Sequence, residues 1–329
     1  MPLHESPQPT TWHGQDAWTL ENDALRLTLV PAMGAKIVSL FDKRNGLEWL
    51  VGPGERPFRP ASYGAVFTEQ DMSGWDEMFP TIVACEYPVP GVRFGAALPD
   101  HGEVWAIPWR LEQHERGRLT LSATGRALPY RLTRAIRFLA DNTLEFSYRL
   151  DNLGSERLAY LWAAHPQFVC GLRCEISLPP QVKRVVNVLP DEWGWGAPET
   201  SYDWPAADVP GQGAAALNQV GPPGFSKARK FFAPPEISVG WAVMARQPTG
   251  AWLRLEWQPV QPPYFGLWID EGAFSAEPVV AFEPMTGYYD SLALAWKKRE
   301  VRLLEADESA EWTLTVRLGP GADPAPDAA

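Results

Sequence analysis

The sequence has 329 residues, of which 45% are hydrophobic and 21% are charged, so it can build a substantial apolar core. Aspartate and glutamate number 40 against 29 lysines and arginines, which gives a formal net charge of −11. Because an acidic surface repels phosphate backbones and anionic lipids, nucleic acid and membrane surfaces are excluded as expected partners.

The predicted elements begin with a polar, irregular arm over residues 1–18. Residues 25–29 then alternate apolar and polar side chains, which is the period of a half-buried strand. Two further apolar runs, 35–41 and 47–51, flank an asparagine–glycine turn of the kind that favours hairpins. The chain is therefore expected to open as an antiparallel meander.

The clearest β pattern lies between residues 118 and 169, where tight polar turns separate the apolar runs. Prolines number 33 and are spread along the chain, which leaves little room for long helices. Strands of this length and spacing predict an all-β fold, a large sandwich of antiparallel sheets. The predicted strands are 118–124, 130–139, 143–151, 157–169, 236–245, 251–258, 264–270, 279–283 and 312–318.

Two stretches rich in proline, glycine and aromatic residues, 53–80 and 190–232, interrupt this rhythm and are expected to form ordered loops. A short helix is predicted over 291–298, and a frayed tail over 320–329. With neither an internal repeat nor a linker-like change in composition, we predict one domain over residues 19–319.

The cysteines are three in number, Cys85, Cys170 and Cys174, and an odd count argues against a disulfide framework. The first ten residues lack the apolar segment of a signal peptide, and no apolar run approaches a membrane helix in length. We therefore expect reduced thiols in a cytoplasmic protein.

Two of the five histidines occupy positions that suit chemistry. His101 precedes a glycine in a loop, and His165 ends a strongly apolar strand. A carboxylate, Glu283, follows four apolar residues and precedes a proline. Burial there would raise its pKa, which suits a general base. Taken singly, each also has a plain structural interpretation: a loop histidine, a core histidine, and a strand-end glutamate that reaches solvent.

Together, His101-Gly102, His165-Pro-Gln-Phe168 and Glu283-Pro284 resemble the site of the galactose mutarotase-like (aldose 1-epimerase) family. The resemblance spans roughly residues 20–320 and implies the β-supersandwich of that family. Family members often carry a substrate-binding arginine before the histidine–glycine pair, and the corresponding stretch, residues 74–80, has none. The resemblance therefore favours the reaction over any particular sugar.

By this resemblance, the protein is an isomerase that interconverts the α and β anomers of an aldose. Glu283 takes the proton of the anomeric hydroxyl, His165 protonates the ring oxygen, and His101 holds a hydroxyl. One base and one acid suffice for this reaction, so no metal or cofactor is expected. The partner is a small-molecule sugar, and the chain is expected to be a monomer or a homodimer.

The pocket lining is expected to include Trp75, Asp76, Glu77 and Trp268, because tryptophan faces stack on sugars and carboxylates bind hydroxyls. An acidic, solvated loop explains residues 75–77 equally well. Arg93, Arg229 and Lys230 would suit a sugar phosphate, although solvated surface side chains are the simpler interpretation.

Three other functions remain open at this point. A non-catalytic carbohydrate-binding protein would keep the aromatic residues without needing Glu283 beside an imidazole. A glycoside-processing enzyme, hydrolase or lyase, would need a longer cleft with paired carboxylates or a tyrosine–histidine site, and Asp270 and Glu271 lie near Glu283 in the sequence. A metal hydrolase is the third, because two histidines and one glutamate can ligate zinc.

Overall fold

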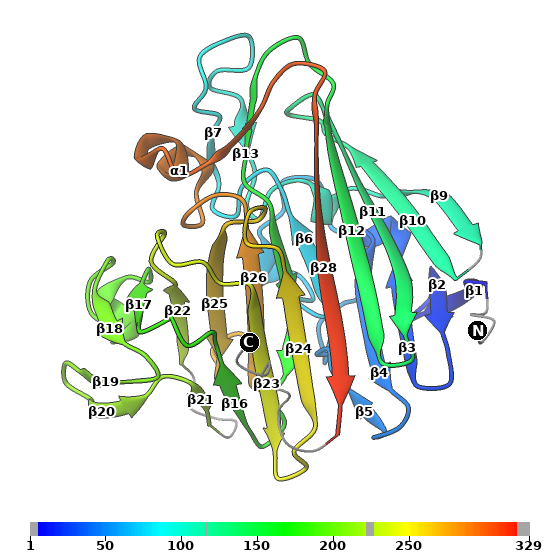
Figure 1. The fold of residues 1–329 in the computed structure, drawn as a ribbon. Coiled ribbons are helices and arrows are strands. Elements are labelled where there is room, and N and C mark those ends of the chain that lie inside the picture. Colours follow the sequence, from blue (N-terminus) through cyan, green and yellow to red (C-terminus); the bar gives the residue numbers. More distant parts are fainter. Residues whose placement is uncertain (1–5, 116, 222–226, 321–329) are drawn as a thin grey trace.

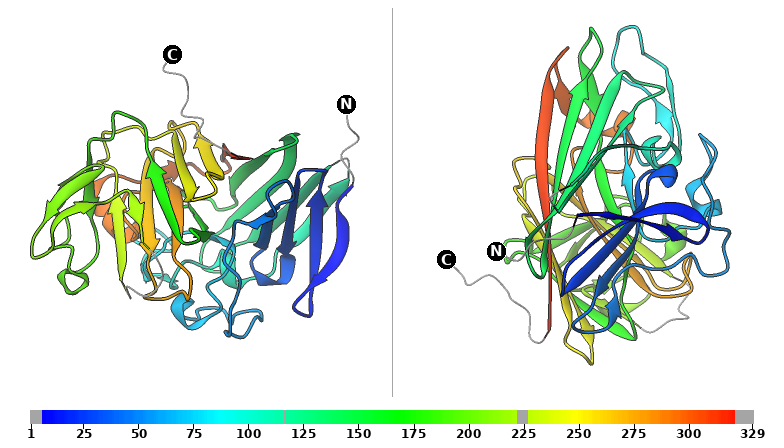
Figure 2. Two further views of the ribbon diagram at one scale, coloured as in Figure 1. Left: turned by 90° about the horizontal axis from the view of Figure 1, so that it is seen from below. Right: turned by 90° about the vertical axis from the view of Figure 1, so that its right-hand side faces the viewer.

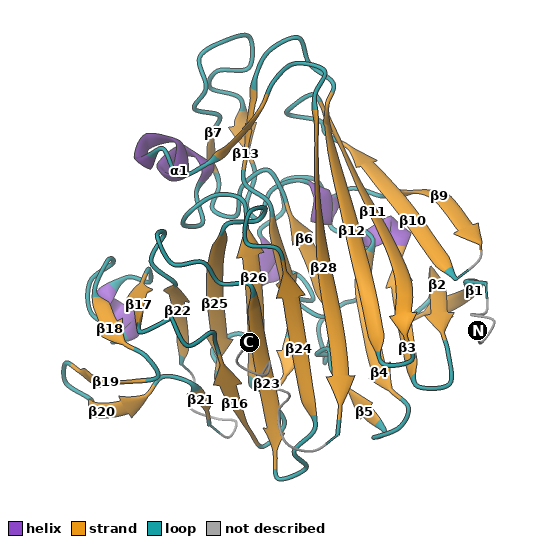
Figure 3. Cartoon of the chain, viewed as in Figure 1, coloured by secondary structure: helices purple, strands orange, loops and turns teal. Residues whose placement is uncertain are grey.

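The computed structural model describes residues 6–115, 117–221 and 227–320 (Figure 1). Strands dominate these residues, and helical segments are short and few (Figure 3). The helical elements are α1 (Leu292–Lys298) and 3-10 turns at Pro31–Met33, Phe67–Glu69, Val104–Ala106 and Asp191–Trp193. The predicted all-β class with antiparallel sheets is confirmed.

The first of two large sheets runs in the order β1-β2-β3-β4-β6-β14-β26-β25-β22-β17-β18, with β5 beside β4 and β15 beside β26. It carries every residue of the candidate site that lies on a strand. Its strands are β1 (Gln8–Trp12), β2 (Gln15–Glu21), β3 (Leu25–Val30), β4 (Lys36–Asp42), β5 (Leu47–Glu48), β6 (Trp75–Met78), β14 (Ala163–Pro166), β15 (Phe168–Val169), β17 (Arg184–Asn187), β18 (Ser201–Asp203), β22 (Ala228–Phe232), β25 (Tyr264–Asp270) and β26 (Val279–Met285).

The second large sheet runs β21-β16-β23-β24-β28-β12-β11-β10-β9, and the two sheets face each other (Figure 2). Its strands are β9 (Arg110–Glu115), β10 (Arg118–Thr124), β11 (Tyr130–Ala140), β12 (Thr143–Asn152), β16 (Arg173–Ser177), β21 (Gln219–Val220), β23 (Trp241–Gln247), β24 (Trp252–Trp257) and β28 (Ser309–Gly319). Three small pairs complete the fold: β7 (Cys85–Glu86) with β8 (Ala97–Leu98), β13 (Leu158–Tyr160) with β27 (Arg302–Leu304), and β19 (Ala206–Val209) with β20 (Gly213–Ala216).

The core lies between the two sheets, and the alternation of the strands supplies it. In β12, Leu144, Phe146, Tyr148 and Leu150 are buried at every second position. The Phe146 ring stacks on Trp75 of the opposite sheet at a centroid distance of 4.7 Å. Burying one such side chain stabilises the fold by about 1.5–3 kcal/mol, so this layer dominates the stability.

A buried polar cluster also connects the sheets. The Glu77 carboxylate on β6 accepts hydrogen bonds from Arg134 Nη1 at 2.8 Å and Tyr148 OH at 2.8 Å. Trp162 Nε1 donates to its second oxygen at 2.9 Å. A buried carboxylate is tolerated when its charge and lone pairs are satisfied in this way, so the cluster fixes how the sheets sit on each other.

The N-terminal arm was predicted wrongly for most of its length. Residues 8–12 and 15–18 pair as β1 and the start of β2, at the edge of the first sheet. Every residue of β1 except Trp12 is exposed, so the strand carries no apolar alternation for sequence analysis to detect. Residues 1–5 lie outside the described part of the chain, as does the predicted tail from residue 321 onward.

The two predicted loops also contain strands. The stretch 53–80 includes β6, and 190–232 includes β18 to β22, whose short segments lie among prolines and glycines. The predicted strand 157–169 is divided into β13, β14 and β15, because the chain moves from one partner strand to another. The short helix over 291–298 is confirmed as α1, which Ser291 caps by accepting the Leu294 N–H.

All three cysteines are free thiols, as predicted. Over the residues that the structure describes, no helix is long and apolar enough to cross a membrane.

Candidate active site

His165 and Glu283 come together on neighbouring strands of the first sheet. β14 and β26 are in register at Ala163 and Met285, and the pairing resumes at Phe168 and Val280. His165 and Glu283 lie opposite each other in the interval between, so their side chains share one face. His165 Nε2 is 3.5 Å from Glu283 Oε1, and both side chains are buried.

Lys230 reaches the same carboxylate from the other side. It pairs with Trp268 of β25, two residues from Gly266, which pairs with Glu283. Lys230 Nζ lies 2.8 Å from Glu283 Oε2 and 2.7 Å from Asp290 Oδ1. Although burial disfavours an ammonium, these two carboxylates raise the pKa of Lys230, so the side chain remains a cation.

Gly266, on the strand between those of Lys230 and Glu283, allows the lysine and the carboxylate to come together. A Cβ added at Gly266 would lie 2.9 Å from Glu283 Oε2, which is closer than real Cβ contacts come. A side chain at position 266 would therefore displace the Glu283 carboxylate, so the glycine leaves the space that this carboxylate occupies.

Burial sets the protonation of the two central groups. Burial raises the pKa of Glu283 to about 7, while the Lys230 ammonium opposes this rise and the Asp290 carboxylate adds to it. Burial, with the nearby His101 and Lys230, holds the pKa of His165 well below its ordinary value of 6.5. At neutral pH, burial therefore favours a neutral His165 and shifts Glu283 toward its protonated form.

His101 is held in a turn that only a glycine can follow. Its backbone is left-handed, with φ of 57°, and its N–H donates to the carbonyl of Ile82. Gly102 also has positive φ, and a Cβ there would lie 2.1 Å from the carbonyl oxygen of Phe79. The histidine–glycine pair thus has a steric cause, because the loop presses directly on the backbone beside β6.

Phe67 and Asp100 fix the His101 ring. His101 Nδ1 is 2.9 Å from Asp100 Oδ1, and the Phe67 ring stacks on the imidazole at 4.2 Å. The Phe67 N–H donates to the other Asp100 oxygen at 2.8 Å. The His101 and His165 rings are then 6.0 Å apart and nearly perpendicular. The structure therefore brings all three predicted catalytic side chains to one place.

His101 and His165 line a cavity of about 160 Å³, whereas Glu283 is fully buried and is not among its lining residues. The cavity lining combines apolar side chains with the two imidazoles, the Lys230 ammonium and Asp290, which suits a small ligand with both apolar and hydroxyl surface. The lining residues are Phe67, Thr68, Met72, Ile82, Val83, His101, His165, Gln167, Leu189, Lys230, Trp268, Phe274 and Asp290. The predicted Trp268 is among them.

Trp75, Asp76 and Glu77 were expected to line the pocket, and the structure does not place them there. Strand alternation points Trp75 and Glu77 into the layer between the sheets. Asp76 pairs with His165 and shares its face, but it is buried against Lys36, whose Nζ lies 2.6 Å from its Oδ2. Successive residues of a strand cannot all face one cavity.

Sequence analysis missed the roles of Lys230, Asp290 and Phe67. Lys230 belongs to a run with three basic residues, which suggested a solvated patch. β22 buries all five of its residues and its sequence, Ala-Arg-Lys-Phe-Phe, does not alternate, so no local pattern distinguished Lys230 from a surface lysine. Asp290 and Phe67 had no signal, since each reaches the site through a loop or a single turn.

The carboxylates that a glycoside-processing enzyme would need beside Glu283 already have hydrogen-bond or ion-pair partners within the protein. The Asp270 carboxylate accepts backbone N–H groups from Gly272, Ala273, Phe274 and Ser275. Glu271 accepts the Gly221 N–H and pairs with Arg229 at 3.4 Å. Neither carboxylate is therefore free to serve as a glycosidase partner of Glu283. Among the described residues, no group of three or more histidine, cysteine or acidic side chains could hold a metal ion.

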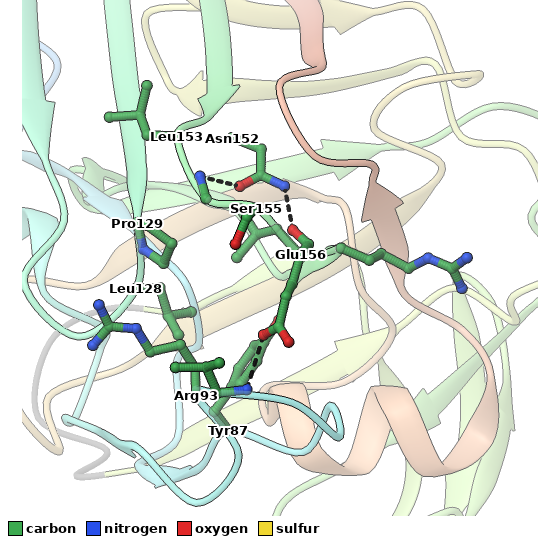
Figure 4. Close-up of a pocket in the computed structure, with 12 residues that line it drawn as sticks. Tyr87, Arg93, Leu128, Pro129, Asn152, Leu153, Ser155 and Glu156 are labelled. Carbon is green, nitrogen blue, oxygen red and sulfur yellow. Dashed lines mark hydrogen bonds between the residues drawn. The ribbon is translucent and has the colours of Figure 1, made fainter.

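A separate cavity of about 390 Å³ lies beside the loop that follows β12 (Figure 4). Its polar groups hold loops together: Asn152 Nδ2 donates to the carbonyl of Glu156, and Glu156 Oε2 accepts the Val92 N–H. None of the described residues that line this cavity is a histidine, and we do not assign the reaction to it.

Comparison with known proteins places the fold. No family model matches the sequence, and no curated protein sequence matches it. Several solved structures, however, match the fold of this chain. A galactose mutarotase-like protein from Lactobacillus casei superposes with a TM-score of 0.66 at 17% identity, covering 92% of this chain and 99% of its own.

Two further structures agree. A galactose mutarotase related enzyme from Lactobacillus acidophilus gives a TM-score of 0.65 at 15% identity, covering 93% of this chain and 98% of its own. A candidate aldose 1-epimerase from Klebsiella pneumoniae gives 0.69 at 14% identity, covering 95% and 84%. The chain therefore has the galactose mutarotase-like fold, as its motifs predicted. At these identities the likeness establishes the fold alone.

Proposed function

We propose that this chain is an aldose 1-epimerase-type isomerase, which opens the ring of a sugar hemiacetal and recloses it on the other face. One observation carries the proposal: the buried Glu283 carboxylate lies between His165 Nε2 at 3.5 Å and Lys230 Nζ at 2.8 Å, and both of these side chains line a cavity of about 160 Å³. A buried carboxylate with a pKa near neutrality can act with a neighbouring imidazole as a general base and a general acid.

The number of protons that Glu283 and His165 share is consistent with acid–base ring opening. Ring opening needs an ionised Glu283 and a protonated His165, whereas burial favours the opposite distribution. Both distributions contain one proton. The active form therefore arises when one proton moves from Glu283 to His165, without exchange with solvent. A sugar that displaces water and presents its hydroxyls to both groups would favour that transfer.

In the forward step, Glu283 accepts the anomeric hydroxyl proton as the bond between C1 and the ring oxygen breaks. His165 donates its proton to the ring oxygen, and the open-chain aldehyde results. Rotation about the C1–C2 bond presents the other face of the aldehyde, and the reverse transfers close the ring. The pair ends with the single proton that it held at the start, so no co-reactant is needed.

The other groups position the substrate and the base. Lys230 holds the Glu283 carboxylate in place, and His101, fixed by Asp100 and Phe67, is available to bind a sugar hydroxyl. Trp268 and Phe274 offer apolar faces to the ring. We further propose a cytoplasmic location, in keeping with three free thiols.

Anomer exchange in a panel of aldoses and aldose phosphates, followed by saturation-transfer NMR, tests the proposal. We expect the protein at micromolar concentration to accelerate exchange in at least one sugar. Saturable sugar binding without acceleration would instead identify a carbohydrate-binding protein, and release of new reducing ends from an oligosaccharide would identify a glycoside-processing enzyme.

A further inference from the structure

The catalytic cavity adjoins a second, larger cavity. Its volume is about 520 Å³ against about 160 Å³ for the catalytic cavity. Met72 and Phe274 line both cavities, so these two side chains form the boundary between them. The two cavities therefore adjoin at Met72 and Phe274, so a ligand in the first lies next to the second.

Two loops, residues 51–56 and 274–277, line the second cavity together with Asp71 and Met72. Arg56 connects these loops: its guanidinium donates to the carbonyl oxygens of Thr68 and Gln70 at 3.0 and 2.8 Å, and to that of Phe274 at 2.8 Å. The Asp270 carboxylate organises the second loop by accepting the N–H groups of residues 272–275. The cavity is therefore preformed, which lowers the entropy lost when a ligand binds.

The chemistry of the second cavity suits a neutral, hydroxyl-rich ligand. Glu55 and Glu277 are exposed along it and offer acceptor oxygens, and the 51–54 loop contributes two glycines. Arg56 is the one cationic side chain among the described lining residues, and carbonyl groups already engage it. The lining thus opposes a phosphate or a sugar acid and accepts sugar hydroxyls.

We propose that this second cavity is a subsite for the next sugar unit of a reducing disaccharide or oligosaccharide, whose reducing end occupies the catalytic cavity. The inference rests on the proposed function and deepens it, because it names the substrate class. The remote sugar unit would contribute binding energy that a free monosaccharide lacks, and kcat/KM would rise accordingly.

The test compares the aldose that exchanges fastest with reducing disaccharides that carry that aldose at the reducing end, again by saturation-transfer NMR. We expect at least one disaccharide to exceed the monosaccharide in kcat/KM by about tenfold, which corresponds to about 1.4 kcal/mol of extra binding. Equal or lower values for every disaccharide would overturn the subsite. Absence of exchange with every sugar would overturn the proposed function itself, and the subsite with it.

A substitution in the second cavity can test the subsite without changing the cavity that His101 and His165 line. Ala276 is exposed and lines the second cavity only, so Ala276→Trp should fill it. The ratio of disaccharide to monosaccharide kcat/KM should then fall about tenfold. Ala214→Trp, on the exposed β19–β20 hairpin, is the matched control and should leave the ratio at its wild-type value. A ratio that Ala276→Trp does not change would contradict the proposal.

Discussion

Lys230 Nζ lies 2.8 Å from Glu283 Oε2, so the proposed base of this protein has a buried cation as its neighbour. The ammonium opposes the effect of burial on the carboxylate, and the result is a pKa of about 7 rather than a higher one. Lys230 therefore acts as a positioning residue that also sets the pH range of the base.

Removing this cation should move the pH profile. In Lys230→Met, burial acts on Glu283 without its main opponent, so the Glu283 pKa rises further. Because the active pair needs one proton, the alkaline limb of kcat/KM should shift to higher pH, and kcat should fall as the carboxylate loses its fixed position. Lys230→Arg should restore part of both. Lys298→Met removes a lysine paired with Glu199 at 2.7 Å near the surface and should leave the profile in place.

The wild-type profile has a definite sign. The Glu283–His165 pair loses its proton as the pH rises through the Glu283 pKa of about 7, so kcat/KM should fall above that value. It should also fall at acidic pH, but only well below 6.5, where His165 takes up a second proton. A rise in kcat/KM through pH 7 would contradict the one-proton pair and indicate that the unprotonated carboxylate works alone.

Gly266→Ala should impair catalysis through the base. The new Cβ would lie 2.9 Å from Glu283 Oε2 and displace the carboxylate from Lys230 and His165. Displacement of about 1 Å lowers kcat by about a hundredfold in comparable sites. Urea unfolding checks that the variant is folded, and a kcat within about twofold of wild type would show that the carboxylate need not be held where it is.

The Glu77 cluster should matter for stability instead. Glu77→Gln leaves Arg134 buried without its charge partner, and the free energy of unfolding should fall by about 3–5 kcal/mol. Glu311→Gln breaks an exposed pair with Arg149 and should change it by less than about 1 kcal/mol. Equal effects of the two variants in urea titrations would contradict the structural role assigned to Glu77.

Sequence analysis reached the fold and the proposed catalytic residues because strand alternation and short motifs carried them. His165 and Glu283 stand at the ends of apolar runs, where a polar side chain is conspicuous. Lys230 escaped notice because a basic run resembles a solvated surface until its strand is known to be central. Trp75 and Glu77 were placed in the pocket because their residue types suit sugars, although the alternation of β6 directs them to the core.

The same limit explains the missed N-terminal strands and the loop residues. β1 pairs through its backbone and buries almost nothing, so its residue types carry no pattern. Phe67 and Asp290 enter the site through tertiary packing between segments far apart in the sequence. Such contacts depend on how the sheets and loops are assembled, which local periodicity does not encode.

The most direct test of the account is the rate of anomer exchange in the accepted aldose at pH 7, measured for wild type and Glu283→Gln. The amide keeps the shape of the side chain but cannot take a proton, so kcat should fall by about 10²–10⁴-fold while the protein stays folded. Glu311→Gln, a surface change of the same chemistry, should keep the wild-type rate. A folded Glu283→Gln variant that exchanges anomers at the wild-type rate would contradict the assignment of Glu283 as the base.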